Sequence, residues 1–145
     1  METQTKLYKD VEEIKNLVKE FEACTLKGEK WTHYAHLTIG IWYLSEYPAE
    51  QATELIRNNI QKYNASRGII MTKENGYHET ITLFYIWVIK KYLLSAPEDS
   101  LVNLTNDLID KFGYKQLPFE YYSKERLMSW EARIGYLEPD LAPLD

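Results

Sequence analysis

The chain has 145 residues, a formal net charge of −5 and a hydrophobic content of 45%. This hydrophobic fraction excludes a disordered protein, and the length suits one domain, residues 1–145, around a single core. The acidic balance argues against a nucleic-acid partner, no apolar run is long enough to span a bilayer, and the lone Cys24 excludes an internal disulfide. We therefore expect a cytoplasmic protein that binds neither nucleic acid nor a membrane.

The spacing of apolar residues predicts helices and no strand. Apolar side chains recur every three or four residues, as on a helix with one buried face. The predicted helices span about residues 10–24, 32–46, 48–64, 77–94, 97–112 and 123–134. The second and fourth are apolar around most of their circumference, which is typical of the middle of a bundle. We expect an all-α antiparallel bundle of about five helices, with a short sixth helix and an extended, proline-containing C-terminal strap.

All three histidines lie where the second and fourth predicted helices begin. His33 and His36 follow Thr32, the expected N-cap, and His78 lies in Gly76-Tyr77-His78-Glu79. Short connections make successive helices antiparallel, so the second and fourth helices should run parallel with their N-termini at one end of the bundle. The topology therefore predicts that the three imidazoles lie close together. The ends of the first and third helices bring further polar residues to the same place: Glu22, Tyr63, Asn64 and Arg67.

These residues are compatible with two kinds of site. A divalent metal (Zn, Fe, Mn or Ni) would take His33, His36 and His78 as ligands, with a carboxylate from Glu22 or Glu79. A metal-free pocket would use His36 and His78 as acid–base groups. Helix N-termini favour a small anionic ligand there, and Arg67 could add a fork of donors. We thus expect a small enzyme or small-molecule binder with a histidine-centred pocket.

The alternative is a structural or interaction module without a metal. A histidine in the first turn of a helix can satisfy backbone groups or pack on Trp31. The 12 Tyr and 4 Trp residues would then serve the packing of two copies in a homodimer. In this interpretation Cys24 is a small apolar filler, the strap covers one end of the core, and Arg133 pairs with a carboxylate such as Asp140.

Several motifs taken together resemble an uncharacterised family of small bacterial all-helical proteins. They are Trp31-Thr32-His33, His36-Leu37, Tyr77-His78-Glu79-Thr80, Ala132-Arg133 and Pro139-Asp140-Leu141. The resemblance implies a cytoplasmic helical domain and no particular activity. The architecture is also similar, more loosely, to DinB-like helical bundles, which place three histidines around a divalent metal. Those proteins draw two ligands from a pair four residues apart late in the chain, whereas His33 and His36 are three apart near its start.

Overall fold

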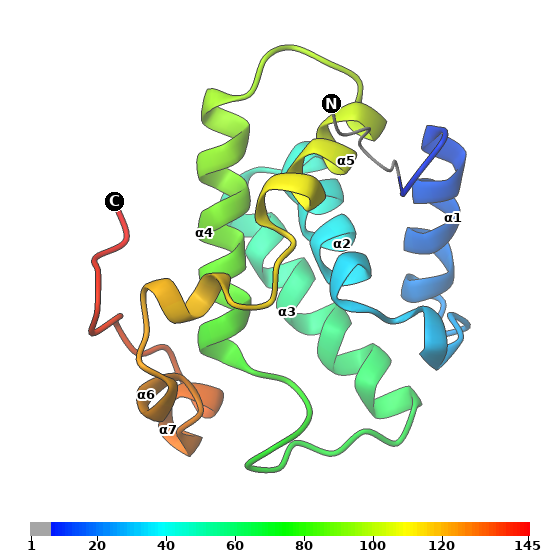
Figure 1. The fold of residues 1–145 in the computed structure, drawn as a ribbon. Helices are drawn as coiled ribbons and strands as arrows, with labels where there is room; N and C mark the ends of the chain where they lie inside the picture. The colour runs from blue at the N-terminus through cyan, green and yellow to red at the C-terminus, as the bar shows by residue number, and fades with distance from the viewer. Residues whose placement is uncertain (1–6) are drawn as a thin grey trace.

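The computed structural model describes residues 7–145, and this part of the chain contains seven α-helices and no strand. The helices are α1 (Val11–Glu22), α2 (His33–Glu46), α3 (Ala49–Ser66), α4 (Glu79–Ser95), α5 (Leu101–Phe112), α6 (Lys124–Leu127) and α7 (Trp130–Ile134). Figure 1 shows the five longer helices packed together, with α6 and α7 beside the first half of α4. The predicted all-α class is confirmed. No helix within residues 7–145 has the length and apolar character needed to cross a membrane.

Side-chain caps determine where several helices begin. The hydroxyl oxygen of Thr32 accepts a backbone N–H at 3.2 Å, which confirms this residue as the N-cap of α2. His78 and Ser100 cap α4 and α5 in the same way. These two helices therefore begin one residue after each cap, rather than at residues 77 and 97 as the apolar spacing predicted.

The predicted sixth helix is two short helices instead of one. Ser123 caps α6 and Ser129 caps α7, each by accepting a backbone N–H three residues ahead. The second serine therefore starts a new helix after only four helical residues. This break turns α7 onto α4, against which it packs closely.

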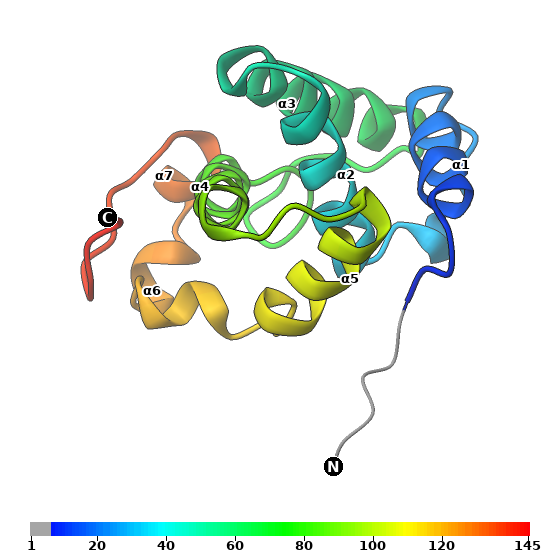
Figure 2. The same ribbon diagram turned by 90° about the horizontal axis from the view of Figure 1, so that it is seen from above.

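Helix α2 is the centre of the bundle. It contacts α1, α3, α4 and α5, and the view from above shows it between α1 and α4, with α3 and α5 on its two other sides (Figure 2). Leu37, Ile39, Ile41 and Tyr43 are accordingly all buried, although they point in different directions around the helix. The sequence predicted this central position of α2, because the segment has no polar, solvent-facing side.

Helices α2 and α4 run in the same direction, as their short connections predicted. The rings of His33 and Tyr85 lie 5.4 Å apart near the start of α2. Further along, Gly40 touches α4 so closely that a Cβ atom there would lie 2.5 Å from Cδ1 of Ile89. The later residue of α2 thus contacts the later residue of α4, so the two helices are parallel and their N-termini lie at the same end of the bundle (Figure 1).

The C-terminal segment after α7 is an extended strap on the outer side of α4. Thr80 donates its hydroxyl to the carbonyl of Gly135 at 2.9 Å and accepts the N–H of Leu137 at 3.1 Å. The predicted pairing of Arg133 with Asp140 is wrong. Asp140 accepts the backbone N–H of Ser123 at 2.7 Å, whereas Arg133 turns toward the interior.

Candidate functional site

A cavity of about 430 Å³ opens at the end of the bundle where α2 and α4 begin. Its aliphatic lining comes from three helices: Leu37 of α2, Ile56 and Ile60 of α3, and Ile81, Ile86 and Ile89 of α4. Its polar lining includes His33, His36, Asn64, His78, Tyr85, Arg133 and Glu74–Gly76 of the α3–α4 loop. Most of these polar groups lie at the ends of helices or in the loop, so the cavity is polar at the end of the bundle and apolar further in.

His36 presents a free nitrogen to this cavity. Its Nδ1 lies 2.8 Å from the carbonyl oxygen of Thr32. Because a carbonyl only accepts, Nδ1 carries the proton and Nε2 keeps its lone pair. The ring stacks on Trp31 with centroids 3.7 Å apart. The residue is exposed at the cavity, yet desolvation by the surrounding protein lowers the pKa of His36 to about 4. The imidazole is therefore a neutral acceptor near neutral pH.

His33 lies close to His36 and also lines the cavity. Its Nε2 is buried and has no hydrogen-bond partner within residues 7–145. The ring meets Tyr85 edge-on at 5.4 Å. Burial, reinforced by the positive charge of Lys115, lowers the pKa of His33. Nε2 of His33 is therefore not accessible to a ligand in the cavity, although the residue as a whole is half-buried.

His78 has both ring nitrogens engaged with the backbone. Nδ1 accepts the N–H of Ile81 at 3.1 Å, and Nε2 donates to the carbonyl of Leu127 at 2.8 Å. The side chain is buried, and desolvation lowers its pKa. Binding a metal or moving a proton would require one of these hydrogen bonds to break. The structural role that we considered for the histidines therefore describes His78 best.

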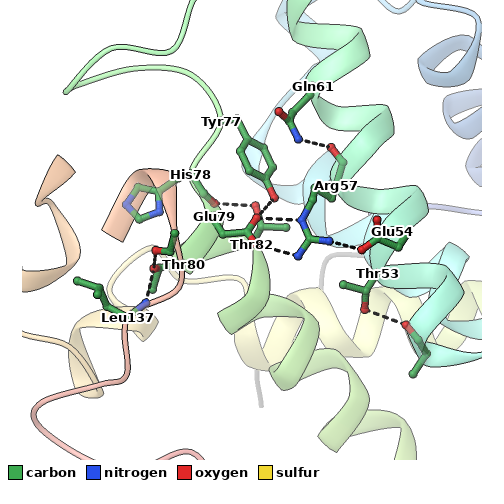
Figure 3. Close-up of polar contacts among 12 residues, drawn as sticks. Thr53, Glu54, Arg57, Gln61, Tyr77, His78, Glu79, Thr80, Thr82 and Leu137 are labelled. Atoms are coloured by element: carbon green, nitrogen blue, oxygen red, sulfur yellow. Dashed lines mark hydrogen bonds and ion pairs between the residues drawn. The ribbon is translucent and has the colours of Figure 1, made fainter. Parts of the chain in front are cut away.

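The two carboxylates considered as metal ligands are engaged elsewhere. Glu22 accepts the hydroxyl of Tyr43 and does not line the cavity. Glu79 is held by the guanidinium of Arg57, at 2.7 Å and 3.1 Å, and by the hydroxyl of Tyr77 at 2.5 Å (Figure 3). Burial raises the pKa of Glu79, but these donors outweigh it and leave the pKa below its ordinary value.

The side chains of the described part of the chain do not converge as a metal centre. Nowhere in residues 7–145 do three or more His, Cys, Asp or Glu side chains gather in an arrangement that could hold an ion. His33, His36 and His78 line one cavity, where both nitrogens of His78 are engaged with the backbone and Nε2 of His33 is buried, whereas Nε2 of His36 has no partner among the described residues.

Arg133 supplies a positive charge to the cavity that we did not expect from the sequence. The side chain is 6% exposed and donates from Nη1 to the carbonyls of Gly76 at 2.9 Å and Tyr77 at 3.3 Å. Its Nε is buried without a partner, and no carboxylate within residues 7–145 forms an ion pair with it. Burial lowers the pKa of Arg133, partly offset by the exposed Glu74, yet a guanidinium stays charged in proteins.

Asn64 adds a polar side chain to the cavity wall that has no hydrogen-bond partner among the described residues. The residue is 8% exposed, and its side-chain amide makes no hydrogen bond to any described residue. It also lines an adjoining cavity of about 520 Å³ beneath the α3–α4 loop, as do His36, Asn75 and Gly76. The two cavities therefore meet around His36 and Asn64. Arg67, our expected anion donor, is exposed beside Gly28 and lines neither cavity.

No protein-family model, curated protein or solved structure matches this chain. The resemblance to small bacterial helical proteins therefore remains a prediction, and the cavity is the basis for assigning a function.

Proposed function

We propose that the protein binds a small anionic ligand with an aliphatic body, and that Arg133 supplies the countercharge. The observation that carries this proposal is a buried guanidinium in a cavity wall without a carboxylate partner. A buried charge is costly unless it is paired. A carboxylate or phosphate in the cavity would provide that pairing by a charge-assisted hydrogen bond from the guanidinium.

The aliphatic wall specifies the rest of the ligand. Ile60 and Ile89 are buried residues of α3 and α4 that nevertheless face the cavity. A volume of about 430 Å³ lies within the range typical of small-molecule pockets. Filling it with a hydrocarbon chain would remove this apolar surface from water, at about 25 cal/mol per Å². The ligand class that fits both ends is an aliphatic carboxylate of medium length.

Binding is a better-supported activity than catalysis. Of the two residues considered as acid–base groups, His78 is committed to the backbone. Nε2 of His36 has no partner among the described residues, and the ring is oriented by a backbone carbonyl rather than by a second side chain. A nucleophile–base pair of the kind that covalent catalysis requires is not formed by the cavity-lining residues that the structure describes.

Isothermal titration calorimetry with sodium decanoate, below its micellar concentration, tests the proposal. We expect saturable binding to the wild type and at least about tenfold weaker binding to Arg133→Met, which corresponds to about 1.4 kcal/mol. Arg67→Met is the matched control, since it removes an arginine that lies outside both cavities. Decanol should bind more weakly than decanoate. Equal affinities of the two variants, or no binding of decanoate to the wild type, would overturn the proposal.

A further inference from the structure

The orientation of His36 restricts what it can offer a ligand. The hydrogen bond to the Thr32 carbonyl keeps the proton on Nδ1, and the stack on Trp31 holds the ring plane. Turning the ring over would break the 2.8 Å bond, although the Thr32 carbonyl would keep the backbone N–H of His36 as a donor at 3.1 Å. Nε2 is therefore fixed as an acceptor on the cavity side.

No described residue occupies this acceptor. Nε2 of His36 has no hydrogen-bond partner among the described residues, and the ring is exposed where the two cavities meet. Asn64 lines the same junction with an unpartnered amide in a residue that is 92% buried. A plain fatty acid could pair with Arg133 but could donate no proton to Nε2.

We propose that the preferred ligand carries, besides its anionic group, an O–H or N–H group that donates to Nε2 of His36. This inference rests on the proposed function and narrows its ligand class to carboxylates with a second, donating polar group. Two chemical sources share this property: hydroxylated fatty acids and N-acylated amino acids. Asn64, which can donate and accept at once, stands beside the same group and fits either source.

Matched pairs of ligands separate the donor from the charge. Calorimetry would compare β-hydroxydecanoate, as separate enantiomers, with decanoate, and N-octanoylglycine with its N-methyl analogue N-octanoylsarcosine. In each pair only the first member has the donating group. In at least one pair we expect the wild type to prefer the donor by about threefold to tenfold, the range of one hydrogen bond. The pair that shows the preference identifies the source.

The variant His36→Phe provides the control, because it keeps an aromatic ring on Trp31 but has no nitrogen. This variant should bind all four ligands, and the two members of each pair should have about equal affinity. If decanoate binds and neither pair differs in the wild type, this inference is wrong while the proposed function stands. If none of the four ligands binds, the proposed function fails as well.

A measurement on the wild type covers the case in which His36→Phe does not fold. In protein with ¹⁵N-labelled histidine, the Nε2 resonance of His36 should show an unprotonated nitrogen, and it should shift when the donating ligand is added. Saturation with decanoate should move it much less. An Nε2 that is already protonated in the free protein, or that shifts equally with both ligands, would overturn the inference.

Discussion

The Nε2 atom of His78 lies 2.8 Å from the carbonyl oxygen of Leu127, so the residue that caps α4 also joins it to α6, 49 positions later. The other nitrogen accepts the N–H of Ile81 and begins the helix. One neutral imidazole thus fixes both the start of α4 and the position of the C-terminal helices. Because α7 carries Arg133, the same contacts help to place the charge in the cavity.

Replacing His78 should destabilise the fold more than it affects any chemistry. For His78→Ala we expect the free energy of unfolding to fall by about 2–3 kcal/mol, from the lost cap and the lost bond to Leu127. His78→Asn keeps a good capping side chain and should recover about 1 kcal/mol. Urea unfolding followed by circular dichroism measures both. An alanine variant as stable as the wild type would show that these bonds contribute nothing.

His33 should behave in the opposite way. Its Nε2 is buried without a partner, so His33→Phe removes an unsatisfied polar atom and keeps the aromatic contact with Tyr85. We expect a free energy of unfolding that is unchanged or raised by up to about 1 kcal/mol. The same urea experiment measures it beside His78→Phe, which should lose stability. A clear loss for His33→Phe would mean that the nitrogen has a partner in solution.

The ion pair between Arg57 and Glu79 should stabilise the junction of α3 and α4. Both side chains are partly buried, at 25% and 16% exposure. A double-mutant cycle with Arg57→Met and Glu79→Gln should give a coupling energy of about 1–3 kcal/mol. Glu54 pairs with the same arginine but is 61% exposed, so the cycle with Glu54→Gln should give less than about 0.5 kcal/mol. Equal coupling in the two cycles would contradict this account.

The histidines should make the fold sensitive to mild acid. Burial lowers the pKa values of His33, His36 and His78 in the folded protein. The unfolded chain, with histidine pKa values of about 6.5, then binds more protons than the folded one. Stability is therefore complete above about pH 6.5 and falls as the pH drops toward about 4, the pKa of His36. Urea midpoints at about pH 7 and pH 5.5 should differ in that direction, and less so in His36→Phe. A urea midpoint that is higher at about pH 5.5 than at about pH 7 would contradict this prediction.

Gly40 should matter for the cavity more than for stability. A methyl group there would lie 2.5 Å from Cδ1 of Ile89 and must displace this side chain, which lines the cavity together with Gly40. The strain, about 1–3 kcal/mol, is offset by the better helix propensity of alanine, about 1 kcal/mol. We expect Gly40→Ala to lose at most about 2 kcal/mol of stability and to bind decanoate severalfold more weakly. Unaltered affinity would place the hydrocarbon chain elsewhere.

Local pattern was sufficient to predict the helices and the end of the bundle at which the histidines gather. Thr32 and the apolar spacing of α2 depend only on neighbouring residues, and the parallel course of α2 and α4 follows from short connections. The split between α6 and α7 was missed because Ser129 reads equally well as a helix interior or a cap. In the structure the Ser129 side chain accepts the N–H of Ala132 and caps α7. The spacing of apolar residues contains no information about such a hydrogen bond.

The bonding state of the site residues could not be predicted in the same way. His78 and Arg133 bind backbone carbonyls 49 and more than 50 residues away, and a carbonyl has no sequence signature. The sequence alone does not distinguish the two arginines, yet Arg67 is exposed and Arg133 is buried. Which arginine enters the cavity depends on how α7 packs on α4, a long-range contact.

A crystal structure of the protein grown with saturating decanoate tests the central claim most directly. We expect the carboxylate within hydrogen-bonding distance of the Arg133 guanidinium, and the hydrocarbon chain between Ile60 and Ile89. A carboxylate bound at another surface, or a cavity that stays free of decanoate while Arg133 contacts only the carbonyls of Gly76 and Tyr77, would contradict it.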